Sequence, residues 1–213
     1  MEAGARIYGG VSADDRRARR RVQLLDAGLE LLGTQGWSGT TMTAVCAKAG
    51  LTERYFYESF ADREALLLAV FDRITDEATE AILAAISSSP GDARARTRAA
   101  IGAFVELMTD DPRKGRVAFV EAMGSEALVR RRYESISAFA ALLGDQARAF
   151  YDLETGGDEL IELTSLVLVG GLAEALMAWL SGSLNTSRER LIEDCTDLFV
   201  ATGETAVALA RNR

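Results

Sequence analysis

The side chains best suited to contact a macromolecule gather in one six-residue stretch, TERYFY, and just upstream of it. Arg54 carries a guanidinium that can bridge the two major-groove acceptors of a guanine, and Tyr55 offers a ring for a thymine methyl and a hydroxyl for a base edge. Thr41, Thr52 and Tyr57 carry hydroxyls suited to phosphate oxygens. These residue types predict contacts to double-stranded DNA.

A tight turn at Gly50 would present these side chains from the start of a short helix. Glycine accepts the positive φ that is usual just past a helix end, so a helix over about 41–49 is predicted to stop there. Thr52 is the predicted N-cap of the next helix, because its hydroxyl can accept a bond from a first-turn N–H. Leu51 and Phe56 have the spacing of a hydrophobic staple, which sets the angle at which the chain enters the helix.

The two faces of this second helix follow from helical spacing. Phe56 and Phe60 lie one turn apart and share the face that is predicted to be buried. Side chains at three consecutive positions point three ways around a helix, so Tyr55 and Tyr57 cannot both be buried with Phe56. The outward set is therefore predicted to be Glu53, Arg54, Tyr55, Tyr57 and Glu58.

Basic side chains flank this unit on both sides. Asp62 is predicted to cap a third helix, whose first turn holds Arg63 for a DNA phosphate. Upstream, residues 1–15 are predicted to form a disordered arm, and a run of arginines follows. Some of these arginines are expected to reach phosphates or a minor groove, and a solvated basic helix end is the alternative. They are Arg16, Arg17, Arg19, Arg20 and Arg21.

A first helix is predicted to run from these arginines to about Thr34, where Gly33 and Gly36 close it. Trp37, in the loop that follows, is predicted to be core. The helix carries one apolar stripe at helical spacing, which is expected to be buried. The stripe consists of Val22, Leu25, Leu29 and Leu32.

Many positions from Thr41 to Leu66 fit one known pattern at once, so the stretch resembles the N-terminal domain of the tetracycline-repressor (TetR) family of transcriptional regulators. The upstream segment LLDAGLELLGTQGWSGTT is similar to the family's first helix and lead-in, so the resemblance covers about residues 16–70. Alanine is usual at Cys46, histidine or tyrosine at Ser59, and lysine at Arg63. The positions in register are Thr41, Val45, Cys46, Ala49, Gly50, Leu51, Thr52, Phe56, Tyr57, Phe60, Arg63, Glu64 and Leu66.

The resemblance implies a homodimer that binds a palindromic operator and needs no cofactor, metal or enzymatic activity. A dimer is also expected on physical grounds, because half-sites about 34–36 Å apart on one face of DNA suit a two-fold protein. The predicted DNA-binding residues are Arg19, Arg20, Thr41, Thr43, Thr52, Glu53, Arg54, Tyr55, Tyr57 and Arg63.

The net charge of -8 is unevenly distributed along the chain. Residues 1–64 hold nine basic and nine acidic side chains, which leaves 15 basic and 23 acidic ones for the remainder. Screening at physiological salt acts over about 8 Å, so a distant acidic domain does little to repel DNA. A neutral DNA-binding region still predicts modest non-specific affinity, so binding would depend on dimerisation and on the arginines.

The residue inventory argues against most enzyme classes. The chain has no histidine, which removes the commonest general base and metal ligand. It also has no Walker loop, dinucleotide-binding glycine loop or nucleophile elbow. Cys46 and Cys195 lie far apart on predicted apolar helix faces, and no signal peptide is expected, which favours a reduced, cytoplasmic protein. A carboxylate pair could still act as acid and base, so an all-helical enzyme stays an alternative, as does a helical adaptor without DNA binding.

Stretches rich in Ala, Leu, Glu and Arg alternate with well-separated turn clusters and predict an all-α protein. A helix-turn-helix DNA-binding domain is expected over 16–62, and a larger ligand-binding and dimerisation domain over 63–213. The connecting helix is expected over 63–86. Further helices are predicted at about 93–109, 113–123, 125–152, 158–181 and 187–211.

The last two predicted helices are expected to pair with their copies in a second subunit as a four-helix bundle. The helix over 158–181 is apolar nearly all round and must be buried on several sides. Its longest uncharged run, Leu163 to Ala173, is too short to cross a bilayer. The apolar stripe of the last helix is predicted to be Leu191, Cys195, Leu198, Thr202 and Leu209.

The middle helices are expected to hold a small, largely apolar effector whose binding releases a repressor from its operator. Glu121 and Glu174 either meet a polar ligand group or point to solvent. Arg130, Arg131 and Arg132 form either an exposed face or a partner for an anionic group. Aromatic residues and methionines at helical spacing suit ordinary core as well as a pocket. The predicted lining is Phe104, Met108, Phe119, Met123, Tyr133, Phe139, Leu143, Met177 and Trp179.

Overall fold

The computed structural model describes residues 12–89, 91–153 and 158–212, and the described chain is helical with no strands. This confirms the all-α prediction. The elements are α1 (Ala13–Gly39), α2 (Met42–Ala49), α3 (Glu53–Tyr57), α4 (Arg63–Ser88), α5 (Ala93–Asp110), α6 (Pro112–Phe119), the short 3-10 helix η1 (Glu121–Met123), α7 (Glu126–Tyr151), α8 (Asp158–Leu180) and α9 (Arg188–Ala210).

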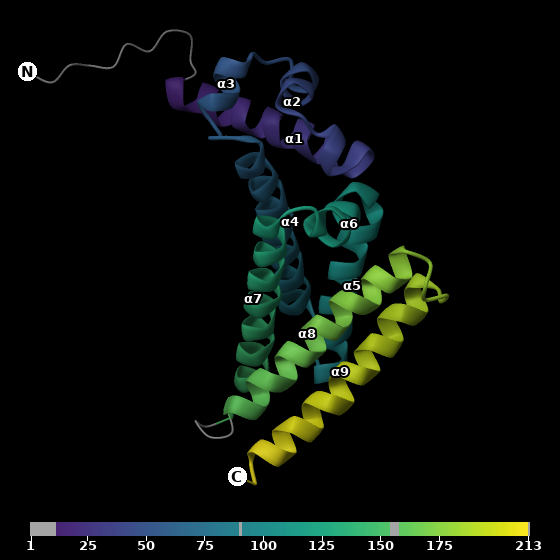
Figure 1. The fold of residues 1–213 in the computed structure, drawn as a ribbon. Coiled ribbons are helices and arrows are strands. Elements are labelled where there is room, and N and C mark those ends of the chain that lie inside the picture. The colour runs from purple at the N-terminus through teal and green to yellow at the C-terminus, as the bar shows by residue number, and fades with distance from the viewer. Residues whose placement is uncertain (1–11, 90, 154–157, 213) are drawn as a thin grey trace, which may run out of the picture.

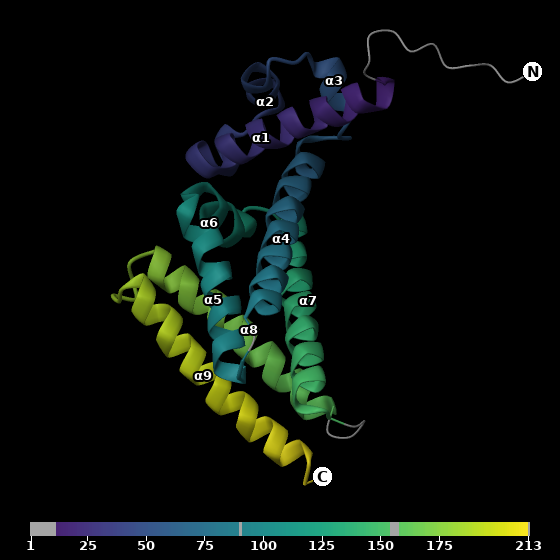
Figure 2. The same ribbon diagram turned by 180° about the vertical axis from the view of Figure 1, so that it is seen from behind.

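Helices α1, α2 and α3 form a small layer at one end of the molecule (Figure 1). Helix α4 leaves this layer and runs beside α5 and α7, so one continuous helix joins the two parts. Helices α8 and α9 lie side by side and cross the others obliquely, as the view from behind also shows (Figure 2). Helix α6 lies between α1 and the larger part, which places it where the two parts meet.

Helix α1 is longer at both ends than the sequence predicts. It begins at Ala13, because the Ser12 side chain accepts from the N–H of Asp15 and the Asp15 carboxylate accepts in return from the N–H of Ser12. Residues 12–15, expected in the arm, thus form a helix cap and first turn, and residues 1–11 lie outside the described chain. The helix also continues past Gly33, with a break at Gly36, where φ is 74°.

Helix α6 is shorter than the predicted helix over 113–123. It ends at Phe119, and η1 follows as a separate tight turn. The turn exists because the N–H of Gly124 donates to the carbonyl of Glu121 at 2.8 Å. It turns Glu121 toward α1 rather than along the axis of α6.

The core runs without a break from the small layer into the larger part. Leu25, Leu29 and Leu32 are buried as predicted. Val22 is 51% exposed, and the first buried residue of α1 is Leu24. The α4 stripe is buried from Leu66 to Ala78. A well-packed α1 against α4 couples the orientation of the small layer to that of the long helix.

Helices α8 and α9 keep much of their apolar surface uncovered within this chain. Glu159–Leu180 is long and apolar enough to cross a membrane by length and composition, although its longest uncharged run was judged too short to do so. Only 17% of its most apolar window is buried. On α9, Leu191 and Cys195 are buried, whereas Leu198, Thr202 and Leu209 are exposed. The predicted α9 stripe is therefore split between an inner and an outer face.

Candidate DNA interface and ligand cavity

The corner between α2 and α3 is built as the sequence predicts, except at Thr52. Gly50 has φ 67° and ψ 30°, and the N–H of Leu51 donates to the carbonyl of Cys46 at 3.0 Å. Thr41 caps α2 by accepting from the N–H of Ala44 at 3.1 Å. Thr52 occupies the N-cap position of α3, but its hydroxyl makes no capping hydrogen bond. This hydroxyl is exposed and available to another group.

One face of α3 is anchored in the core by two phenylalanines. Phe56 is fully buried, and its ring centroid lies 5.8 Å from that of Phe60. Val45 of α2 belongs to the same buried cluster. A five-residue helix is too short to be stable alone, so this packing, rather than local propensity, holds α3 in place.

The opposite face of α3 points into solvent. The Arg54 side chain is 85% exposed, and its Nε lies 3.4 Å from a carboxylate oxygen of Glu58, one turn later. Tyr57 is 57% exposed, and Glu53 is also exposed. Thr41 and Thr43 of α2 are exposed as well. The tip therefore presents a cation, hydroxyls and a ring on a rigid support.

Arginines of α1 bind the end of α3. Arg20 lies over the Tyr55 ring at 4.3 Å from its centroid and pairs with Glu58 at 3.1 Å. Arg17 donates to the carbonyl of Glu58 at 2.6 Å, and Arg21 donates to that of Ser59 at 2.9 Å. These cations meet the negative end of the helix dipole and its unpaired carbonyls. Without DNA, these three arginines therefore contact α3 and the residues after it, and the expected contacts to phosphates or a minor groove stay a prediction; Tyr55 is half-buried beneath Arg20.

The remaining predicted contacts also occupy defined places. Arg19 is exposed on α1. Arg63 lies over the Trp37 ring at 4.5 Å and donates to the Trp37 carbonyl at 3.4 Å, so its guanidinium fastens α4 to the end of α1. Trp37 is only partly buried, and Arg63 covers one of its faces. The sequence pattern placed Glu58 on the outward face but did not predict its ion pair with Arg54. The i, i+4 spacing of the two residues could have revealed it.

Residues 24–70, which span α1 to the first turns of α4, match the family model for bacterial regulatory proteins of the tetR family. The N-terminal part of this chain is therefore similar to that of the tetR family. The matched region contains the Gly50 corner, the buried face of α3 and the capping residue Asp62, so the family pattern coincides with the residues that position the exposed tip.

Known proteins resemble this chain over the small layer and over the whole fold. The HTH-type transcriptional activator FasR of Mycolicibacterium smegmatis is 31% identical over 103 residues, 48% of this chain and 47% of that protein, so the chain spans about half of that relative. The fatty acid degradation regulator FadR of Bacillus halodurans has a TM-score of 0.70 at 16% identity, over 84% of this chain and 94% of that one. FadR of Bacillus subtilis, solved with stearoyl-CoA, has a TM-score of 0.65 at 17% identity, over 87% and 97%. At these identities the structures show a shared fold.

The larger part of the chain holds an elongated cavity of about 240 Å³ between α4, α5, α7, α8 and α9. Its lining extends along α5 from Ala93 to Met108, about 22 Å at 1.5 Å per residue. Most of the lining is aliphatic or aromatic, and Phe104 meets Phe119 and Phe139 at centroid distances of 6.5 and 6.2 Å. This elongated apolar space is called the channel below.

Five of the nine predicted lining residues face this cavity, namely Phe104, Met108, Phe119, Phe139 and Leu143. Tyr133 is 62% exposed and lies outside it. Met177 and Trp179 pack on the core instead, and the Trp179 indole N–H donates to the carbonyl of Thr186 at 2.8 Å. The side chain of Met123 lies outside the described residues. Helical spacing alone could not tell the cavity side of α7 and α8 from their other sides.

Glu121 serves neither of the two roles expected for it. It is 9% exposed and accepts from the backbone N–H of Trp37 at 2.8 Å and from Arg116 Nε at 2.9 Å. Its carboxylate thus joins η1 and α6 to the end of α1. Glu174 is exposed and pairs with Arg132, whose side chain is largely buried, contrary to the exposed face predicted for the arginine run.

A second contact between α1 and α6 depends on Arg113. Its guanidinium donates to Glu30 at 2.6 Å and to Asp111 at 2.7 and 2.8 Å. These hydrogen bonds hold the pKa of both carboxyl groups below their ordinary values and raise the pKa of Arg113. Gly33 permits this close approach, because a Cβ there would lie 2.3 Å from that of Arg113.

Proposed function

We propose that this chain is a ligand-responsive transcriptional regulator that binds operator DNA as a homodimer, with α3 as the recognition helix. The exposed tip formed by Arg54, Tyr57 and the nearby threonines carries the proposal. An α-helix fits the major groove with its N-terminal residues against base edges. The anchoring of α3 through Phe56 supports this function, because a rigid helix holds Arg54 ready to contact a base.

The homodimer would form through the uncovered apolar surfaces of α8 and α9. Leu163, Leu166 and Val167 of α8 and Leu198 of α9 are all exposed within one chain. A Cβ placed on Gly170 or Gly171 would meet nothing within 4 Å, so a second backbone could approach there. Burial of this surface against a second copy explains a helix of membrane-like composition in a protein that works on DNA in the cytoplasm.

The effector would occupy the channel between α4, α5, α7, α8 and α9. An elongated, mostly apolar space of this kind suits a flexible hydrocarbon chain. The structural relationship to FadR of Bacillus subtilis, solved with stearoyl-CoA, agrees with a ligand that carries such a chain. We therefore place acyl compounds first among the candidate effectors.

Helix α6 would carry the signal from the channel to the DNA-binding region. Ala118 and Phe119 line the channel, and the same helix is tied to α1 through Arg113 and Glu121. A ligand that binds one position of Phe119 more tightly than another favours the corresponding orientation of the DNA-binding region. The size of this shift is set by the difference between the two binding affinities. We propose that the bound state no longer matches the operator, which makes the protein a repressor.

A mobility-shift experiment with the full chain and the DNA upstream of its own gene tests this function. We expect a salt-sensitive shift that is lost on addition of an acyl effector. The absence of a shift with any neighbouring DNA at low salt would refute DNA binding. A reporter gene under the bound promoter then decides the sign of regulation, which matters because the FasR relative is named an activator.

A further inference from the structure

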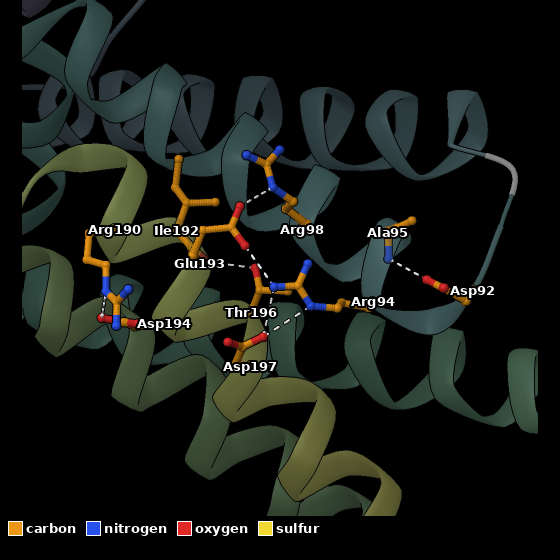
Figure 3. Close-up of polar contacts among 10 residues, drawn as sticks. All are labelled: Asp92, Arg94, Ala95, Arg98, Arg190, Ile192, Glu193, Asp194, Thr196 and Asp197. Atoms are coloured by element: carbon orange, nitrogen blue, oxygen red, sulfur yellow. Dashed lines mark hydrogen bonds and ion pairs between the residues drawn. The ribbon is translucent and has the colours of Figure 1, made fainter.

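Three arginines on the first turns of α5 differ sharply in their partners. Arg94 donates to Glu193 at 2.8 Å and to Asp197 at 2.9 Å, and Arg98 pairs with Glu193. These two arginines lie one turn apart and face α9, as Figure 3 shows. Both charges are thus neutralised by the protein itself, which fastens α5 to α9.

Arg96 lies between them in sequence and, two positions along a helix, faces away from both. It lines the channel, and its guanidinium carbon lies 5.5 Å from the centroid of the Phe150 ring. The Arg96 Nε is buried and has no hydrogen-bond partner. Among the described residues, no carboxylate lies within ion-pairing distance of it, in contrast to its two neighbours.

The polar groups toward the other end of the channel are already satisfied. Arg132 pairs with Glu174, and the hydroxyls of Thr75 and Ser135 donate to carbonyls of their own helices at 3.1 and 3.0 Å. Phe104, Phe119 and Phe139 fill the space around them. The channel therefore has an apolar end near α6 and one uncompensated cation at the end near Phe150.

We propose that Arg96 binds the anionic head group of an amphipathic effector whose hydrocarbon chain extends along the channel toward Phe104 and Phe119. This inference rests on the effector site assigned above and names the chemistry of its ligand. From Arg96 to Met108 the channel follows α5 for about 18 Å at 1.5 Å per residue, a length that accommodates an extended alkyl chain. The hydrocarbon tail would reach the residues next to α6, so the same molecule would fill the end of the channel that adjoins α6.

The preference for an anion follows from the cost of the unbound state. A buried donor without an acceptor has lost its hydrogen bonds to water, and no protein hydrogen bond replaces them. A carboxylate or a phosphate oxygen would supply the missing acceptor, and hydrogen bonds between two charged groups are the strong ones. A neutral alcohol of equal chain length would bury the same hydrocarbon but satisfy Arg96 less well.

Binding of three matched compounds to the full-length protein, without DNA, tests the proposal. Isothermal titration calorimetry would compare dodecanoate, dodecyl phosphate and dodecan-1-ol on the wild type, Arg96→Gln, Arg96→Lys and the control Arg98→Gln. We expect at least one anion to bind the wild type about tenfold more tightly than the alcohol. Arg96→Gln should abolish this advantage, Arg96→Lys should restore part of it, and Arg98→Gln should retain it. A carboxylate and a phosphate head group are distinguished by which anion is favoured.

Thermal unfolding provides a readout that a merely structural arginine would not give. Without ligand, Arg96→Gln should be at least as stable as the wild type, because it removes an unsatisfied buried donor. With dodecanoate, it should gain less stability than the wild type does. Equal affinity for the alcohol and the anions, an equal loss in Arg98→Gln, or no binding of any of the three compounds would overturn the head-group assignment. DNA binding, measured separately, would stand or fall independently of that result.

Discussion

The backbone N–H of Trp37 donates to a carboxylate oxygen of Glu121 at 2.8 Å and so joins the last turn of α1 to the turn after α6. The two residues are 84 positions apart in the sequence. Arg116 donates to the other oxygen of the same carboxylate, so both oxygens are used. Because α6 also lines the channel, this hydrogen bond and the contact of Arg113 with Glu30 link the channel-lining helix to the DNA-binding region.

Glu121→Ala should destabilise the protein and weaken its response to ligand. The change leaves the Trp37 N–H and the Arg116 guanidinium without their acceptor, which should cost about 1–3 kcal/mol. Urea unfolding measures this loss, and the effector-induced fall in operator affinity should shrink in parallel. Glu126→Gln, an exposed acidic position on α7, is the control and should change stability by less than about 0.5 kcal/mol. An unaltered ligand response in Glu121→Ala would show that the link does not carry the signal.

Arg54→Ala should weaken binding to the cognate operator by about 1–3 kcal/mol and blunt sequence preference. Its side chain is 85% exposed, so the unfolding free energy should stay nearly constant. Affinities on the cognate site and on a scrambled duplex, measured at several salt concentrations, separate base reading from charge. An equal loss on both duplexes would mean that Arg54 contacts only the backbone.

Arg63→Ala is expected to weaken binding to all duplexes alike and to flatten the salt dependence. Because Arg63 stacks on Trp37, the same change should also lower the unfolding free energy by about 0.5–1 kcal/mol. Thermal melting of the free protein therefore accompanies the binding assay. A sequence-selective loss in Arg63→Ala would reverse the roles assigned to the two arginines.

Local sequence predicted the Gly50 corner and the burial of Phe56, because both depend on neighbours within one or two turns. It failed where the partner is remote. The type of residue does not reveal that Arg20 will meet Glu58, 38 positions away. Periodicity likewise found the apolar positions of α9 but could not tell which of them are buried within this chain, as the exposed Leu198 shows. The channel is a property of five helices together, so Arg96 gave no signal within its own segment.

Arg20→Ala should loosen α3 rather than remove a DNA contact. Loss of the Tyr55 stacking and of the Glu58 ion pair should lower the unfolding free energy by about 1 kcal/mol. Arg19→Ala, one position earlier and exposed, is the matched control and should leave stability unchanged. Urea unfolding followed by circular dichroism distinguishes the two variants. Equal stability of both would return Arg20 to the role of a DNA-binding arginine.

Val167→Glu should convert the proposed dimer into monomers. Val167 is 61% exposed within one chain, and a carboxylate buried at a subunit interface would face a large desolvation cost. Sedimentation velocity at micromolar concentration measures the change, and operator affinity should fall with it. The control is Val22→Glu, because Val22 is also a largely exposed valine but lies on α1. Two variants with the same sedimentation coefficient as the wild type would place the interface elsewhere.

The contact of Arg113 with Glu30 and Asp111 should make stability fall in acid. The Arg113 hydrogen bonds lower the pKa of Asp111 from its ordinary 3.8 and that of Glu30 from 4.5. A carboxyl group with a depressed pKa in the folded state adds stability above its ordinary pKa and loses it as the pH falls through the lowered value. Arg113→Met keeps the aliphatic stem and removes the charge, so it should be less stable than the wild type near pH 7.

The difference between the wild type and Arg113→Met should narrow below about pH 4 and vanish once both carboxyl groups are protonated. Urea midpoints measured from pH 7 down to pH 3 test this, with Arg130→Met, on an exposed part of α7, as the control. The control should follow the wild type throughout. A constant difference at every pH would mean that Arg113 stabilises the α1–α6 contact through packing against Gly33 and not through its two carboxylates.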